Sequence, residues 1–78
     1  MNCLYKTKEE AIKSYGSIFE HYKGGIYRVL NDNVKHTENS ERGVYYEHIW
    51  PNAHGFYYRP YDVFFSDVEK GKKRFKPL

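Results

Sequence analysis

The sequence VYYEHIWPNAHGFYYRP, residues 44–60, carries the strongest strand signal in the chain and decides its fold class. In its first half, aromatic and β-branched side chains alternate with the two-residue period of a half-buried strand. The side chains on one predicted face of that strand are Val44, Tyr46, His48 and Trp50. The segment Pro51–Gly55 has the composition of a turn, and Phe56–Arg59 is aromatic again before Pro60 ends it. The stretch therefore predicts an antiparallel hairpin.

Further short strands are predicted on both sides of this hairpin. The β-branched and aromatic segments are Ser17–Tyr22, Ile26–Leu30, Val34–His36 and, near the end of the chain, Arg74–Phe75. Turn signals occur at Lys23–Gly25 and Asn31–Asn33, and Thr37–Gly43 is predicted to be a polar loop. The stretch Tyr61–Val68 is apolar in part, and its candidates for the core are Val63, Phe64, Phe65 and Val68.

The segment before the first predicted strand indicates one short helix. Thr7-Lys8-Glu9-Glu10 has the form of a capping box, in which the Thr7 hydroxyl accepts a hydrogen bond from the Glu10 amide while the Glu10 carboxylate reaches back. Helix-forming residues continue to Lys13, and Gly16 ends the run. A helix of about two turns is therefore expected over residues 7–14.

The size and composition of the chain limit it to one small domain with a core built from rings. Of its 78 residues, 15 are aromatic and only 12 are Leu, Ile or Val. Disorder is not expected, because disordered chains lack aromatic residues. We predict a mainly β fold: a small, strongly curved sheet or SH3-like barrel or roll of five to six short strands with a short N-terminal α-helix. Residues 1–15 would form a helical extension and residues 16–78 the small β-barrel domain.

The formal charge of +3 is concentrated in the last twelve residues. Residues 1–66 hold equal numbers of basic and acidic side chains, whereas Asp67–Leu78 holds five basic and two acidic ones. A nucleic-acid-binding surface normally spreads basic residues over one face of the fold, among aromatic ones. The terminal run is therefore interpreted first as a solvated turn and tail, and binding of nucleic acid through Lys70–Lys76 is the weaker alternative.

The sequence shows no segment suited to a membrane and no sign of export. The longest stretch without Asp, Glu, Lys or Arg, His48–Tyr58, is too short and too polar to span a bilayer. The N-terminus carries charges where a signal peptide would need an apolar run. Cys3 is the only cysteine, so no internal disulfide is expected, which fits a reducing compartment. A cytoplasmic location is predicted.

Four ordered blocks of residues share the pattern of a known family. The first is His21-Tyr22-Lys23-Gly24 with Tyr27 and Val29, and the second is His36-Thr37-Glu38 with Glu41, Val44 and Tyr45. The third is Tyr58-Arg59-Pro60 with Phe64, and the last is Arg74-Phe75. In these blocks the chain resembles the bacterial and phage proteins catalogued as domain of unknown function 1653. It departs from their pattern at Asn39, Gly43 and Val63. The resemblance covers Gly16–Leu78 and implies a compact β-roll or barrel, but no activity.

The most suggestive polar cluster is His36-Thr37-Glu38. Zinc deaminases use a His-x-Glu spacing, but they also need a Pro-Cys-x-x-Cys motif, which a chain with one cysteine lacks. Two interpretations remain. Thr37 and Glu38 either satisfy backbone amides in a tight loop, or they line a pocket mouth with His36, opposite Arg59 and Arg74. Each arginine in turn either faces a carboxylate or phosphate ligand or forms an internal ion pair.

Neither a metal centre nor a catalytic site is indicated. The four histidines show neither the i, i+4 helical spacing nor the close knuckle spacing of zinc sites. No nucleophile elbow, phosphate-binding Gly-rich loop or Cys-His pairing is visible in the sequence. No cofactor is implied, and enzyme activity is the least supported class of function.

The favoured hypothesis is a non-enzymatic binding module for a small anionic or nucleotide-like ligand. Lys23 and Arg59 would supply cationic donors, and Tyr27, Tyr58 or Trp50 a stacking surface. The predicted ligand-binding residues are His21, Lys23, Tyr27, His36, Thr37, Glu38, Trp50, Tyr58, Arg59 and Arg74. The first alternative is a protein-interaction module, such as a phage-borne inhibitor of a host protein, and the second is nucleic-acid binding. Aromatic side chains left on the surface would then serve a partner or a homo-oligomer contact.

Overall fold

The computed structural model describes residues 5–35, 37–53 and 55–78 of the chain. Its elements are α1 (Lys8–Ile12), β1 (Ser17–His21), β2 (Ile26–Lys35), β3 (Arg42–Trp50), β4 (Phe56–Pro60), α2 (Tyr61–Phe64), β5 (Asp67–Glu69), β6 (Lys72–Lys73) and β7 (Phe75–Pro77). Five strands form one antiparallel sheet in the order β4-β3-β2-β1-β7, and β5 and β6 form a separate hairpin. The predicted mainly β fold with a short N-terminal helix is confirmed.

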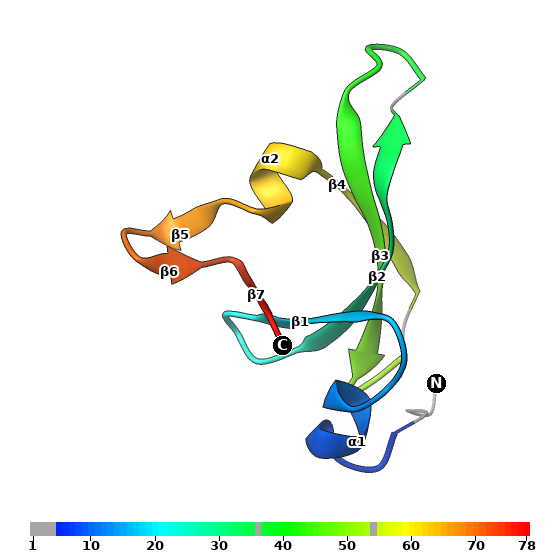
Figure 1. The fold of residues 1–78 in the computed structure, drawn as a ribbon, viewed down its shortest axis with the longest axis vertical. Helices are drawn as coiled ribbons and strands as arrows, with labels where there is room; N and C mark the ends of the chain where they lie inside the picture. The colour runs from blue at the N-terminus through cyan, green and yellow to red at the C-terminus, as the bar shows by residue number, and fades with distance from the viewer. Residues whose placement is uncertain (1–4, 36, 54) are drawn as a thin grey trace.

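The sequence predicted either a strongly curved sheet or a barrel or roll, and the described strands form an open, curved sheet without closing into a barrel. β4 and β7 stand at the two ends of the strand order and do not pair with each other. Figure 1 shows why: after β4 the chain turns into α2 and the β5–β6 hairpin, which lie across from β2 and β3, before β7 joins the other end of the sheet beside β1. The chain thus covers the sheet with a helical turn and a hairpin instead of closing it.

The predicted hairpin over residues 44–59 is confirmed as β3 and β4, with Tyr45 opposite Tyr58 and Tyr46 opposite Tyr57. The prediction that Trp50 shares a face with Tyr46 is wrong. Tyr27 pairs with His48, but the next residue of β2, Ile26, pairs with Trp50, so β3 holds one extra residue, Ile49, at this point. Such a bulge breaks the alternation of faces, and Trp50 consequently packs against the cluster on the other side of the sheet.

Asn31–Asn33, predicted to be a turn, lies within the continuous strand β2. The register between β2 and β3 shifts twice here, once on each side of Asn31, so the polar residues form bulges. The Asn33 amide donates to the Asn31 side-chain oxygen at 2.8 Å, which gives the backbone a local partner that a regular ladder would not. Pairing with β3 thus overrides the turn propensity of these residues.

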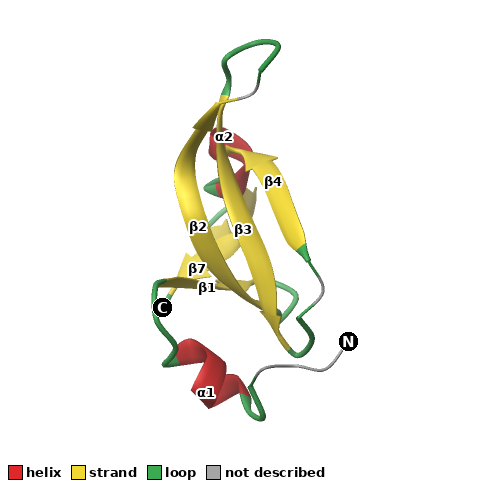
Figure 2. Cartoon of the chain, turned by 90° about the vertical axis from the view of Figure 1, so that its right-hand side faces the viewer, coloured by secondary structure: helices red, strands yellow, loops and turns green. Residues whose placement is uncertain are grey.

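The core consists of two buried clusters, one on each face of the sheet. On the inner face, which looks toward α2 and β7, the buried residues are Val44, Tyr46, Phe64 and Phe75. On the outer face, where α1 packs, they are Ala11, Ile18, Ile26 and Ile49. Figure 2 shows α1 below the lower end of the sheet and α2 behind its upper end. The inner core is therefore mostly aromatic, as the composition predicts, and the smaller outer core is aliphatic.

The segment after β4 differs most from its prediction. Of the four core candidates, only Phe64 is fully buried, while Val63 and Phe65 are 39% and 38% exposed. Because Tyr61–Phe64 is a single helical turn, its successive side chains point in different directions: Phe64 is buried in the core, Tyr61 packs against it in part, and Val63 faces out. The basic C-terminal run is not a loose tail, because it forms β6 and continues into β7, a strand of the main sheet.

The predicted N-terminal helix is present as α1, with the Thr7–Glu10 capping box formed in both directions. It is tied to the outer face by Arg28, a β2 side chain that is only 3% exposed. The guanidinium donates to the hydroxyls of Tyr5 and Ser14 at 2.6 and 3.1 Å. It also donates to the Tyr15 carbonyl and to Glu47, both at 3.0 Å. One buried arginine therefore connects the segment around α1 to two strands.

Candidate functional site

His21 lies where β1 ends and the chain turns toward β2, and the turn fixes its protonation pattern. The Lys23 amide donates to His21 Nδ1 at 3.2 Å, so this nitrogen carries the lone pair. In the neutral ring the proton therefore sits on Nε2, which is a donor. The turn is closed by the Gly24 amide on the His21 carbonyl at 2.7 Å, and Gly24 adopts a φ of 106° that favours glycine.

Phe75 forms the floor beneath His21. Its ring is 2% exposed, stacks on Phe64 with 4.1 Å between ring centroids, and meets the His21 ring edge-on at 4.9 Å. The Arg59 guanidinium lies 5.7 Å from the same ring, and Arg59 Nε donates to the Tyr46 hydroxyl at 3.2 Å. Phe75 thus brings a β1 histidine and a β4 arginine to one place on the inner face.

Positive charge surrounds the His21 ring. Burial first, and then the charges of Arg59, Lys23 and Arg74, hold the pKa of His21 below its ordinary value. The ring is therefore neutral at pH 7. Neither Arg59 nor Arg74 forms an ion pair with a carboxylate of the described residues; their Nε atoms donate to the hydroxyls of Tyr46 and Ser66 instead. We refer to His21, Lys23, Arg59 and Arg74, with Phe75 below them, as the His21 site.

Tyr27 lies beside the His21 site with its hydroxyl protonated. Its ring meets those of His21, Tyr46 and Phe75 at centroid distances of 6.0, 5.5 and 5.4 Å. Burial raises the pKa of Tyr27, the neighbouring Tyr46 and Tyr57 raise it further, and Arg59 acts in the opposite direction. A neutral phenol beside Arg59 can donate a hydrogen bond, so Tyr27 adds a donor to the cations of the site, which together favour an acceptor-rich ligand.

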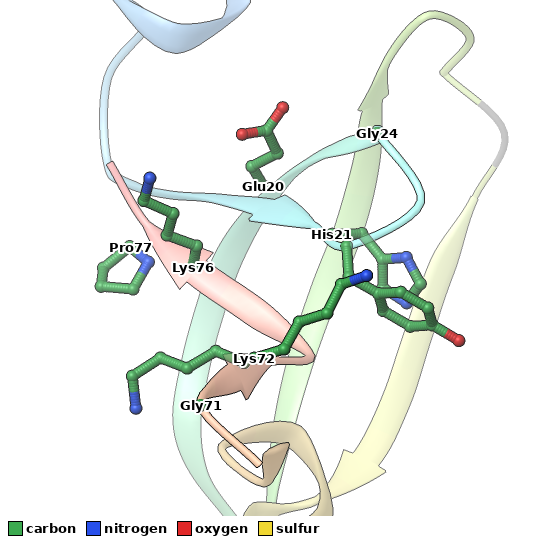
Figure 3. Close-up of a pocket in the computed structure, with 9 residues that line it drawn as sticks. Glu20, His21, Gly24, Gly71, Lys72, Lys76 and Pro77 are labelled. Carbon is green, nitrogen blue, oxygen red and sulfur yellow. The ribbon is translucent and has the colours of Figure 1, made fainter. Parts of the chain in front are cut away.

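A cavity of about 670 Å³ adjoins the His21 site. Its walls include Glu20, His21, Tyr22, Lys72, Lys73 and Lys76. Figure 3 shows Lys76 on β7 beside β1, and Lys72 extending from β6 toward the end of β1. The ammonium groups of Lys23 and Lys72 lie 5.7 and 5.6 Å from the centre of the Tyr22 ring. We refer to this space as the lysine cavity, and His21 belongs both to it and to the His21 site.

The structure brings together half of the predicted ligand-binding residues. They are His21 on β1, Lys23 in the following turn, Tyr27 on β2, Arg59 on β4 and Arg74 just before β7. Thr37 and Glu38 lie instead in the turn between β2 and β3, at the far end of the long hairpin (Figure 1). Trp50 packs on the outer aliphatic cluster. Tyr58 faces outward, where its ring covers Gly43. His36 lies outside the described residues.

Sequence reasoning did not place the residues of the cavity wall together. Tyr22 appeared in a family motif, and Lys72, Lys73 and Lys76 lay in a run interpreted first as a solvated turn and tail, with nucleic-acid binding as the weaker alternative. Their signal was the concentration of charge in the last twelve residues, but nothing local indicates that this run folds back beside His21.

The outer face carries a second group of exposed rings. Tyr45 and Phe56 stack with 5.7 Å between centroids and are 39% and 62% exposed, and Tyr58 beside them is 38% exposed. Among the described residues, no group of three or more His, Cys, Asp or Glu side chains is placed to hold a metal ion. No helix in the described part of the chain is long and apolar enough to cross a membrane.

The chain matches a protein family. A family model described as "Protein of unknown function (DUF1653)" matches residues 17–77, which is most of the chain. It includes every residue of the His21 site and of the lysine cavity named above, and it leaves α1 outside. No curated protein and no solved structure matches the chain.

Proposed function

This chain belongs to the DUF1653 family of proteins of unknown function, and we propose that it is a non-enzymatic binding module for a small anionic, nucleotide-like ligand. The observation that carries the proposal is that three cations, Arg59, Lys23 and Arg74, lie near one neutral imidazole while no described carboxylate pairs with either arginine. Cations held close together without counter-charges repel each other, and an anion relieves that repulsion. A cytoplasmic location, where phosphorylated metabolites are abundant, is part of this proposal.

Each residue of the His21 site has a role in this proposal. Arg59 and Arg74 use Nε to bond to the protein, and their terminal amino groups would bind the oxygens of a phosphate or carboxylate. His21 Nε2 and the Tyr27 hydroxyl would add neutral donors. A planar group of the ligand would stack on Tyr22 or Tyr57, which are 38% and 37% exposed. No group here is poised to break a bond, so the proposal is binding without chemistry.

We expect Arg59→Ala to remove the thermal stabilisation that a ligand gives. A ligand at about one hundred times its Kd adds about 2.7 kcal/mol to the free energy of unfolding, which would raise the Tm of a domain of this size by roughly 10–20 °C. The measurement is a thermal-shift screen of nucleotides, inorganic phosphate and acidic metabolites against both proteins.

The matched control is Arg42→Ala, which also removes an arginine stacked on a ring, 4.0 Å from the centre of Tyr61, but away from His21. Its response to ligands should equal that of the parent. If no compound in the screen raises the Tm of the parent protein, or if Arg59→Ala responds as the parent does, the proposed function is wrong.

Anion binding should strengthen as the pH falls, because of His21. The folded protein holds the pKa of His21 below 6.5, and an anion bound among Arg59, Lys23 and Arg74 would offset their charges and raise that pKa. Binding then takes up a proton, so affinity rises as the pH drops from about 8 toward 5. In the unliganded protein the sign is opposite: stability falls below about pH 6.5, because the unfolded chain protonates His21 more readily.

Isothermal titration with sulfate measures this effect, since sulfate keeps its charge across that pH range. The control is His21→Gln, which cannot titrate but can still donate a hydrogen bond. We expect the affinity of the parent to depend more steeply on pH than that of the variant. Equal slopes in the two proteins would mean that His21 does not contact the anion.

The first alternative, a protein-interaction module, would use a different surface. The stacked Tyr45–Phe56 pair on the outer face is the most exposed ring contact among the described residues, which favours it as the contact surface. The two candidates separate cleanly: Phe56→Ser should weaken capture of a stoichiometric host protein and leave ligand binding intact, whereas Arg59→Ala should do the reverse.

A further inference from the structure

The excess positive charge of the protein is gathered around one cavity. The last twelve residues carry all of the net charge, and three of their lysines, Lys72, Lys73 and Lys76, line the lysine cavity. The one carboxylate in its walls, Glu20, is already paired with Lys8. Lys72 lies 3.9 Å from Glu69, a residue outside the walls, in a pair whose two side chains are more than half exposed. The cavity therefore presents a positive wall in which Lys73 and Lys76 form no ion pair with a described carboxylate.

An exposed aromatic side chain stands at the same place. Tyr22 is 38% exposed, and its ring centre lies within 6 Å of the ammonium groups of Lys23 and Lys72. The His21 ring lies against it, with 4.5 Å between centroids and a tilt of 36°. Lysine side chains are flexible and need not stay on the ring, so the outer face of Tyr22 is available to another flat group.

We propose that the lysine cavity binds single-stranded nucleic acid, with Lys72, Lys73 and Lys76 on the phosphates and Tyr22 stacked on a base. This inference rests on the proposed function, because His21 lines the cavity as well as the anion site. It extends that function from a free nucleotide to a polymer whose terminal or internal phosphate occupies the His21 site.

A single strand fits this surface better than a duplex does. Stacking on Tyr22 requires the face of an unpaired base, and a base in a duplex hides both faces in the helix. A volume of about 670 Å³ lies within the range of small-ligand pockets and accommodates only a short stretch of chain. Its flexible ammonium groups track phosphates without reading bases, so little sequence preference is expected.

The expected salt dependence follows from the number of lysines. We assume that Lys72, Lys73 and Lys76 each neutralise one phosphate and that Lys23 contributes in part. A plot of the logarithm of the association constant against the logarithm of the salt concentration should then have a slope of about −2 to −3. Replacing two of these lysines should reduce the slope by about one to one and a half.

Fluorescence anisotropy with a labelled ten-nucleotide oligothymidine tests the inference in the full-length protein. Lys72→Gln with Lys76→Gln should weaken binding about tenfold at low salt and flatten the salt dependence. The matched control, Lys13→Gln with Lys35→Gln, makes the same change of charge outside the cavity walls and should bind as the parent does. Tyr22→Ala should lose at least about fivefold, and Phe56→Ala, an exposed ring on the outer face, should lose nothing.

The competing outcomes separate the two proposals. If a mononucleotide binds in an Arg59-dependent way and the oligonucleotide binds no more tightly, the nucleic-acid inference is wrong and the proposed function stands. If the oligonucleotide binds equally well to both lysine double variants, general electrostatic attraction explains it and the cavity is not its site. If neither mononucleotide nor oligonucleotide binds the parent protein, both the inference and the nucleotide form of the proposed function are wrong.

Discussion

Replacing Phe75 by alanine should lower the Tm of the protein by roughly 15–30 °C. Truncation of a buried phenylalanine costs about 3–5 kcal/mol, and each kcal/mol lowers the Tm of a domain of this size by about 4–8 °C. Phe75 is 2% exposed and contacts the rings of Phe64, Tyr46, Tyr27 and His21, so little of its volume can be refilled by relaxation. A domain of this length is expected to have only about 4–12 kcal/mol of stability.

Thermal unfolding followed by circular dichroism measures this effect. The control is Phe56→Ala, which removes the same side chain from a position that is 62% exposed on the outer face and should shift the Tm by only a few degrees. Equal losses in the two variants would show that Phe75 is not the centre of the inner core. A large effect at Phe75 alone would show that the floor of the His21 site is part of the inner core.

The fold could be predicted wherever its signals are local. The hairpin of β3 and β4 follows from alternation around a Pro-Asn turn, and the capping box at Thr7 follows from a four-residue pattern. Long-range pairing decides the rest. Asn31 and Asn33 have turn propensity but lie in β2, because β3 pairs with residues on both sides of them. The position of β7 beside β1 depends on long-range contacts, such as the hydrogen bond that the Tyr22 amide donates to the Arg74 carbonyl at 3.0 Å.

The same division applies to the site. Two of the predicted site residues that the structure brings together, His21 and Arg59, end or flank predictable strands. Trp50 and Tyr58 lie away from them, because their position depends on which face of a strand they occupy, and a single bulge changes that face for Trp50. Two lysines of the cavity, Lys72 and Lys73, lie in a short hairpin that has too few apolar residues to be recognised as strands, and Lys76 lies in the three-residue strand β7. Their proximity to Tyr22 is a property of the tertiary fold alone.

Arg28→Met should cost about 3 kcal/mol and loosen the segment around α1. Removing one member of a buried ion pair typically costs about 3–5 kcal/mol, and the lower end applies because Glu47 retains contact with water. Burial would lower the pKa of Arg28, but hydrogen bonds to Tyr5 and Glu47 hold it above its ordinary value, so the lost group is fully charged. Methionine keeps the length of the aliphatic stem and removes the donors.

Urea denaturation and amide hydrogen exchange together separate anchoring of α1 from simple packing. In Arg28→Met, the Ala11 and Lys13 amides, which donate within the helix to Thr7 and Glu9, should lose protection more than the amides of β3 do. Arg42→Met, at an arginine whose side chain is 49% exposed, is the control and should change little.

Removing both charges gives the sharper test of why Arg28 is there. In Arg28→Met alone, the Glu47 carboxylate loses its charged partner. Adding Glu47→Gln replaces that carboxylate by a neutral amide, so the double variant should be more stable than Arg28→Met. If Arg28 acts mainly through Glu47, the double variant returns close to the parent. Protection of α1 should nevertheless stay low, because the bonds from Arg28 to Tyr5, Ser14 and Tyr15 are still missing. Full recovery of both stability and protection would contradict the assignment of Arg28 as the anchor of α1 and leave the ion pair as its sole role.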